Sequence, residues 1–195
     1  MPSFVWGTIK TASKGVSWYV LKRMQFHFII VLVQATNPNL RMKVKKSAGI
    51  LLYKRVHGQL VVLLVHPGGP FLKNKDTGQW SIPKGEFSGD ENAFNAAIRE
   101  FEEETGTRLE GHFMELSPVK LKSGKVVYAW ALESDINADA VVSNTFDMEW
   151  PPKSGSLKSF PEIDKAQWFT VDEALEKINE AMGDFILQLI GKMEA

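Results

Sequence analysis

The chain has 195 residues, 44% of them hydrophobic, and its 23 basic and 23 acidic side chains leave no formal net charge. This composition predicts one soluble globular domain with a core of ordinary size. Cysteine is absent, which excludes disulfide bonds, thiolate nucleophiles and zinc sites built on Cys.

Residues 1–41 carry basic side chains but no acidic one, and the first acid of the chain is Asp76. The apolar run from Phe26 to Val33 is too short for a transmembrane helix. Three interpretations stay open: a disordered basic extension, a leader for export or an organelle, or an upstream start before a domain that begins at Met42. We expect the functional domain to cover residues 42–195, without a membrane span and in the cytoplasm unless residues 1–41 are a leader.

Nucleic acid is not an expected partner, because the basic first 75 residues lack the pattern of any familiar binding module. The oligomeric state stays open.

After Met42 the pattern is that of a mixed α/β domain. Residues 47–56 and 59–66 are β-prone and apolar, and the intervening His57 and Gly58 predict a hairpin. Residues 113–122 and 125–133 predict a second hairpin about Ser123 and Gly124. Residues 166–169 predict a short strand.

Two helices are expected near the C-terminus. Thr170 and Glu173 form a capping box before the first, and the second presents an apolar face at 185–190. The stretch 144–160 is long for a connection, and we expect it either to cover the active site as a specificity loop or to cover a sheet edge.

Between the hairpins, residues 85–107 predict a helix. Ser88 and Glu91 form a capping box before it, and Gly106 ends it. Apolar residues recur at helical spacing between them: Ala93, Phe94, Ala97, Ile98 and Phe101.

Four glutamates crowd the end of this helix: Glu100, Glu102, Glu103 and Glu104. The helix dipole disfavours each carboxylate there by roughly 0.3 to 1 kcal/mol. At about 100° per residue, all but Glu102 share one edge of the helix. Carboxylate oxygens are the ligands that Mg²⁺ prefers, so we infer a bound divalent cation.

Arg99 stands beside these carboxylates, and its expected partner outside the cluster is Glu91. In an ideal helix, eight residues separate the two Cα atoms by about 12 Å. The pair therefore requires either a long reach by the arginine or a helix that starts late.

Residues 85–107 resemble the Nudix box, in which a glycine, a glutamate, an R-E pair, an E-E pair and a second glycine stand at fixed spacing. Every fixed position is present here, namely Gly85, Glu91, Arg99, Glu100, Glu103, Glu104 and Gly106. Thr107 departs mildly from the apolar residue that the pattern prefers. The resemblance covers roughly residues 45–180 and implies an α/β fold, the Nudix-type α/β/α sandwich with a mixed central sheet.

The resemblance also implies a function. It is that of a Mg²⁺ or Mn²⁺ dependent pyrophosphohydrolase, which cleaves a phosphoanhydride bond in a nucleoside diphosphate linked to another group. By the same resemblance, the metal ligands would be Glu100, Glu103, Glu104 and the backbone carbonyl of Lys84, supported by the Glu91 and Arg99 pair. Glu162, which precedes Trp168 as in the C-terminal part of many Nudix domains, is a candidate base or extra ligand; its alternative is a solvated loop carboxylate.

The substrate is less defined. The segment from Trp80 to Gly85 is similar to the WxxPKG entry of hydrolases that act on dinucleoside polyphosphates and diphosphoinositol polyphosphates. This resemblance implies a small-molecule substrate with a polyphosphate chain, either a dinucleoside polyphosphate or a nucleoside triphosphate. Lys84, Lys120 and Lys122 are candidates for phosphate contacts, or else simply solvated lysines.

One alternative belongs to a different functional class, a Nudix domain that binds ligand without turnover. The intact box argues against it, because a pure binder has little use for unneutralised glutamates at a helix end.

Overall fold

The structure is a computed structural model that describes residues 11–12, 16–17 and 44–194. The chain divides into two compact units, Met1–Lys43 and Val44–Ala195. In the first unit, β1 (Thr11–Ala12) pairs antiparallel with β2 (Val16–Ser17). The rest of residues 1–41, to which the three interpretations of the N-terminal segment apply, lies outside the described residues. No helix in the described part of the chain has the length and hydropathy needed to cross a membrane.

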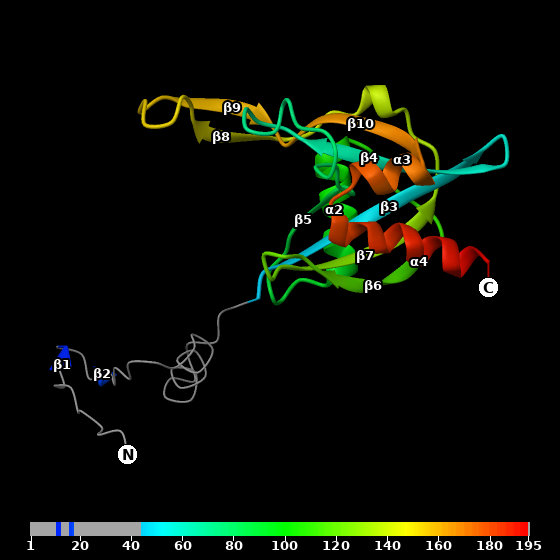
Figure 1. Cartoon of the computed structure of the whole chain (residues 1–195), viewed down its shortest axis with the longest axis horizontal. Coiled ribbons are helices and arrows are strands. Elements are labelled where there is room, and N and C mark those ends of the chain that lie inside the picture. Colours follow the sequence, from blue (N-terminus) through cyan, green and yellow to red (C-terminus); the bar gives the residue numbers. More distant parts are fainter. Residues whose placement is uncertain (1–10, 13–15, 18–43, 195) are drawn as a thin grey trace, which may run out of the picture. The chain divides into compact units, whose positions relative to one another are not determined.

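A mixed sheet forms the centre of the second unit (Figure 1). Its strands run in the order β10, β4, β3, β7, β6, and β5 pairs with β3 beside this path. β3 and β7 are parallel, whereas the other pairs are antiparallel. The strand bounds are β3 (Lys46–Val56), β4 (Gln59–Pro67), β5 (Lys84–Glu86), β6 (Met114–Lys120), β7 (Val126–Glu133) and β10 (Ile163–Thr170).

Both predicted hairpins are confirmed. His57 (φ 51°) and Gly58 (φ 83°) connect β3 to β4, and a two-residue hairpin turn commonly requires positive φ at both positions. β6 and β7 pair antiparallel around Gly124, which also has a positive φ of 86°.

Helices cover both faces of the sheet, which confirms the α/β/α sandwich. α2 (Ala93–Thr105) covers one face, where Phe101 and Ile50 belong to the same buried cluster. α3 (Val171–Lys177) and α4 (Gly183–Met193) cover the other, where Phe185 packs in the cluster that contains Leu51. Neighbouring residues of β3 thus serve opposite layers, as the alternation of a strand requires. The predicted capping box of Thr170 begins α3.

The stretch 144–160 is a hairpin of its own. β8 (Thr145–Glu149) pairs antiparallel with β9 (Leu157–Pro161), apart from the central sheet (Figure 1). Two short 3₁₀ helices complete the fold, η1 (Ala138–Ala140) and η2 (Glu180–Met182). The strands β8 and β9 were not predicted within what we expected to be a long connection, although Phe146 and Met148 alternate with polar residues along β8.

Candidate functional site

The helix that carries the glutamates starts later than its sequence predicts. Asn92, not Ser88, caps it, and its side chain accepts hydrogen bonds from the backbone N–H groups of Phe94 and Asn95 (3.0 and 3.2 Å). The predicted Ser88 and Glu91 capping box is therefore wrong. Glu91 instead lies in a turn before the helix, where its N–H donates to the Ser88 carbonyl (3.2 Å).

The late start brings Glu91 to Arg99. Arg99 Nε and Nη2 donate to the two carboxylate oxygens of Glu91 at 3.1 and 3.2 Å, a two-pronged pair of the kind that fixes both planar groups. The remaining terminal nitrogen, Nη1, donates to Glu100 Oε1 (2.7 Å) and Glu103 Oε2 (3.0 Å). These carboxylates, with Glu91 contributing most, raise the pKa of Arg99 above its ordinary value. Arg99 thus holds three carboxylates of the box at once.

Glu104 is held by the strand that precedes the helix. The Lys84 N–H donates to Glu104 Oε2 at 2.7 Å. In the ladder with β3, Ile50 N–H donates to the Pro83 carbonyl (3.1 Å), so Lys84 occupies the next, non-hydrogen-bonded position opposite Gly49. Both backbone groups of such a residue point away from the partner strand. The Lys84 carbonyl therefore points to the same side as the N–H that contacts Glu104.

Gly85 allows β5 and α2 to approach each other closely. A Cβ atom at this position would lie 1.7 Å from Glu100 Oε2, which is closer than any non-bonded contact. Glu100 is buried, at 9% exposure, although its carboxylate is charged at neutral pH in an ordinary setting. A side chain at residue 85 would take the place of this carboxylate.

Burial and mutual repulsion act on the acidic groups. Burial raises the pKa of Glu104 to about 8, repulsion by Glu100 and Glu162 adds to it, and the positive Lys84 side chain opposes it. Burial also raises the pKa of Glu100, against the hydrogen bond from Arg99, and repulsion by Glu103 and Glu162 adds to that shift. Burial lowers the pKa of the Lys84 ammonium. The repulsion shows that Glu162 belongs to the same acidic region.

Backbone hydrogen bonds explain why Glu162 lies there. Its N–H donates to the Asn144 carbonyl (2.9 Å), and the Asn144 N–H donates to the carbonyl of Glu103 (3.1 Å). The Glu162 carbonyl accepts from the Gly68 N–H (2.8 Å). Glu162 is partly buried, at the junction of β9 and β10. Glu102 is exposed.

The donor set fits a divalent cation by its chemistry. It combines hard carboxylate oxygens with a backbone carbonyl, and buried like charges gain from a cation between them. As they stand, no three His, Cys, Asp or Glu side chains in the described part of the chain form a metal-holding group. Arg99 Nη1 binds Glu100 Oε1 and Glu103 Oε2, and it does not bind the second oxygen of either carboxylate.

The candidate phosphate-binding lysines beyond Lys84 are not gathered at the acidic region. Lys122 pairs with Glu180 (2.6 Å), and both side chains are more than 80% exposed. Lys120 is exposed at the end of β6. Lys125, by contrast, pairs with Glu86 (2.6 Å) close enough to Lys84 for its charge to lower the Lys84 pKa.

His66 of β4 is buried, at 2% exposure. Its Nδ1 lies 2.7 Å from Asp164 Oδ1 and its Nε2 lies 2.7 Å from the Lys75 carbonyl oxygen. The imidazole therefore joins β10 to the loop after β4. Sequence alone gave no sign of this role.

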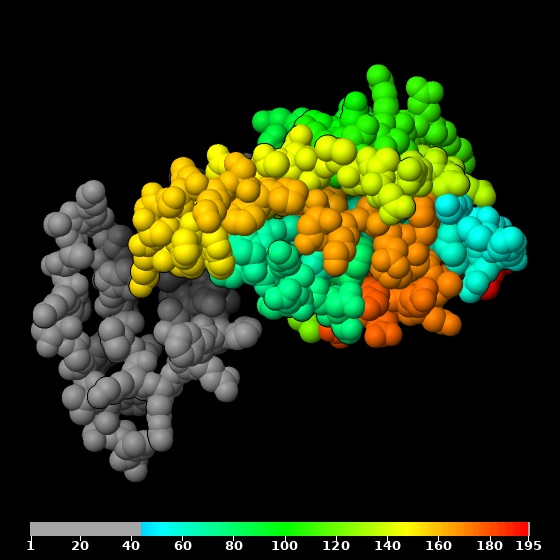
Figure 2. Space-filling view, turned by 90° about the horizontal axis from the view of Figure 1, so that it is seen from above, coloured from blue at the N-terminus to red at the C-terminus, as the bar shows by residue number. Residues whose placement is uncertain are grey.

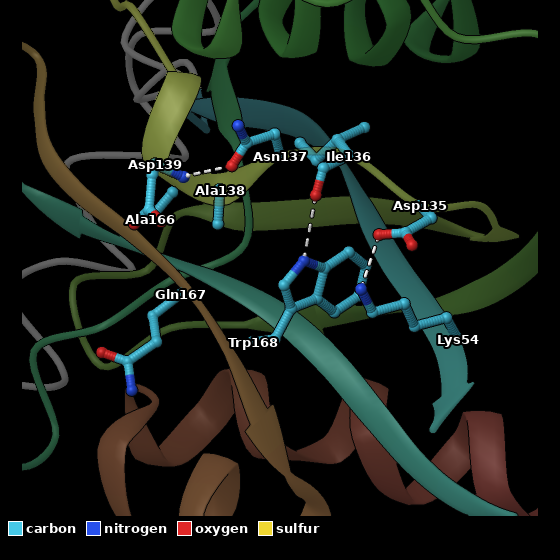
Figure 3. Close-up of a pocket in the computed structure, with 9 residues that line it drawn as sticks. All are labelled: Lys54, Asp135, Ile136, Asn137, Ala138, Asp139, Ala166, Gln167 and Trp168. Carbon is cyan, nitrogen blue, oxygen red and sulfur yellow. Dashed lines mark hydrogen bonds and ion pairs between the residues drawn. The ribbon is translucent and has the colours of Figure 1, made fainter. Parts of the chain in front are cut away.

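A surface hollow lies apart from the box (Figure 3). Trp168 borders it, and its Nε1 donates to the Ile136 carbonyl (3.2 Å). Lys54 Nζ lies 4.3 Å from the centre of the Trp168 ring and 2.5 Å from Asp135 Oδ1. No residue of the box lines this hollow.

Comparison with known proteins identifies the fold. The NUDIX domain family model matches residues 43–189. Similar solved structures include a Caenorhabditis elegans Ap4A hydrolase in a binary complex, with 21% identity over 77% of this chain and 98% of that one (TM-score 0.53). The NUDIX domain of Shewanella oneidensis NrtR complexed with ADP ribose has 16% identity over 87% and 99% (TM-score 0.57). A mutT/nudix family protein from Listeria innocua has 18% identity over 79% and 96% (TM-score 0.53). Among curated proteins, none matches the chain.

Proposed function

Because the chain belongs to the Nudix family and is a pyrophosphohydrolase acting on acid anhydrides, we propose that it cleaves a dinucleoside polyphosphate or a nucleoside triphosphate at the acidic end of α2. The proposed cofactor is Mg²⁺ or Mn²⁺. The observation that carries this proposal is the arrangement of the box: Arg99 holds Glu91, Glu100 and Glu103, while the Lys84 N–H holds Glu104.

The ligands proposed for the cation are Glu100, Glu103, Glu104 and the Lys84 carbonyl. When bound, a divalent cation would neutralise the negative charge that develops on the phosphate and would make a water more acidic. The Glu103 side chain is 41% exposed, so it is free to turn from Arg99 towards a ligand. Arg99 stays in place meanwhile, because its two hydrogen bonds to Glu91 do not involve the ligands.

Glu162 and Glu100 are the candidate bases. Cleavage of a phosphoanhydride requires a water to attack in line with the leaving oxygen, and a nearby carboxylate can orient that water and accept its proton. Glu162 lies close enough to Glu100 and Glu104 to raise the pKa of both. Neither Arg99 nor the Lys84 N–H binds Glu162, which leaves its oxygens available to a water.

Two observations support the substrate class. The segment from Trp80 to Gly85 places the Lys84 backbone at the acidic region, whereas Trp80 itself is buried at 4% and donates to Asp76 (2.7 Å). The likeness to the C. elegans Ap4A hydrolase shows a shared fold, and it makes diadenosine tetraphosphate the first compound to assay.

The test is a substrate panel with Mg²⁺ or Mn²⁺, repeated on Glu103→Gln and on the control Glu102→Gln. The control changes a neighbouring exposed glutamate of the same helix. We expect turnover that depends on the metal. Glu103→Gln should lower the turnover rate about 100-fold or more, since losing even an outer-shell group costs about 10- to 100-fold. The control should not change the turnover rate. Unaltered turnover in Glu103→Gln would refute the metal assignment. Metal-dependent binding of these compounds without cleavage would instead establish a binding module.

A further inference from the structure

The β8–β9 hairpin begins and ends beside the proposed ligands. The Asn144 N–H, just before β8, donates to the carbonyl of Glu103 at 3.1 Å. Glu162, just after β9, donates to the Asn144 carbonyl at 2.9 Å. One end of the hairpin is therefore bonded directly to the acidic end of α2, and the other end is bonded to it through Asn144.

Four aromatic side chains join this hairpin to the loop after β4, and we call them the aromatic clasp: Phe71, Phe146, Trp150 and Phe160. Phe71 and Trp150 have ring centroids 5.2 Å apart and perpendicular planes. Trp150 and Phe160 lie 6.5 Å apart, and Phe160 stands opposite Phe146 in the hairpin. The loop comes so close that a Cβ on Gly69 would lie 3.2 Å from the Phe146 ring. Figure 2 shows the hairpin and this loop side by side.

The loop side of the clasp is firmly held at its base. The Gly68 N–H donates to the Glu162 carbonyl (2.8 Å), and the buried His66 contacts the Lys75 carbonyl through Nε2 (2.7 Å). Phe71 nevertheless exposes 57% of its surface. An isolated hairpin is marginally stable in water, so the aromatic contacts also supply the packing that β8–β9 needs.

Spacing along the hairpin relates the clasp to the chemistry. Phe160 lies two residues before Glu162, a separation of about 7 Å in a strand. The backbone N–H of Trp150 donates to the Ser156 carbonyl (2.9 Å). Ser156 is six residues before Glu162, a separation of about 20 Å along an extended strand. The clasp thus begins next to the acidic region and extends outward from it. In a nucleotide, a ribose and the phosphate chain likewise separate the base from the reacting phosphorus.

The loop and the hairpin carry charges of both signs, with Asp147 and Glu149 on β8. Lys73 and Lys75 follow Phe71 in the loop, and Lys153 and Lys158 lie on the hairpin. Among the described residues, none of these four lysines takes part in an ion pair. Their ammonium groups therefore have no carboxylate partner within that part of the chain and would attract the phosphate chain of a bound substrate.

We infer that the aromatic clasp binds a nucleobase of the substrate, with Phe71 and Trp150 as its stacking surfaces. This inference rests on the proposed function and specifies how the substrate is recognised. The rigid rings offer flat apolar surfaces on which an aromatic base stacks. Such stacking accepts any of the bases, because every base has a π-face.

The test compares diadenosine tetraphosphate with its abasic counterpart, two ribosyl groups joined by the same tetraphosphate. Stacking on one aromatic side chain is worth about fivefold to 150-fold in affinity. We therefore expect Phe71→Leu to lower kcat/KM for the adenine compound at least fivefold, mainly through KM, and to leave the abasic compound unchanged. Phe71→Tyr should retain the activity of the unaltered protein. Leu157→Ala, a change at a 71% exposed position of the same hairpin, is the matched control and should have no effect.

Three outcomes would overturn the inference. An equal loss for both compounds in Phe71→Leu, or no loss for either, would show that the ring does not contact a base. Sedimentation that shows a dimer of the unaltered protein, dissociated by Phe71→Leu, would show that a second copy of the chain covers the clasp. Failure of the unaltered protein to cleave any compound of the substrate panel, nucleoside triphosphates included, would refute the proposed function itself, and the clasp with it.

Discussion

Replacing Gly85 by alanine tests whether the close approach of β5 to α2 sets the position of Glu100. The added Cβ would lie 1.7 Å from Glu100 Oε2, and real Cβ atoms essentially never come closer than 3.0 Å to a non-bonded atom. The carboxylate must therefore retreat by about 1.3 Å or more, or the strand must move away from the helix. A displacement of about 1 Å at a catalytic group can cost about 100-fold in rate.

We accordingly expect Gly85→Ala to lower kcat about 100-fold at saturating Mg²⁺, and overpacking to lower the free energy of unfolding by about 1 to 3 kcal/mol. Steady-state kinetics, Mn²⁺ titration calorimetry and urea denaturation measure these effects. Gly89→Ala is the matched control, since a Cβ there meets no atom within 4 Å. A folded Gly85→Ala protein that keeps full activity and full metal affinity would refute the reasoning.

Three further predictions concern Glu91, Asn92 and Asp76. Glu91→Gln weakens the two-pronged pair that holds the guanidinium, and we expect kcat to fall about 10- to 100-fold with little change in KM, measured by steady-state kinetics. Asn92→Ala should cost about 1 kcal/mol in urea denaturation as a lost N-cap, whereas Ser88→Ala should cost nothing measurable. Hydrogen bonds from Lys177 and an indole N–H hold the pKa of Asp76 below its ordinary value. Its contribution to stability is therefore present above pH 4 and is lost as the pH falls through the depressed pKa, so Asp76→Asn should reduce the dependence of Tm on pH below about 4.

The capping of α2 shows why one local rule failed. Ser88 and Glu91 have the spacing of a capping box, and Asn92 is an equally good cap. Glu91 cannot both close a capping box and hold Arg99, and in the structure it holds Arg99. The choice was made by a side chain eight residues away, which a local pattern does not include. The box itself was predictable because all its fixed residues lie within one short segment.

The aromatic clasp was hidden for a different reason. The two strands of its hairpin are short and largely exposed. Its fourth ring, Phe71, comes from a loop far earlier in the chain and meets Trp150 only in the folded protein. The predicted hairpins, by contrast, have turn residues and buried strands that are visible in sequence order. Contacts within a segment were therefore predictable, and contacts between distant segments were not.

The position of Glu162 likewise depends on contacts between distant segments of the chain, and it has a consequence for function. Its place beside Glu100 and Glu104 depends on backbone groups of Asn144 and Gly68, which almost any residue could supply. Because Asn144 binds the backbone carbonyl of Glu103 and β9 continues into Glu162, a change of the hairpin's position would shift the backbone of both residues. Recognition of a base at the clasp is thus mechanically connected to the groups proposed to carry out the cleavage.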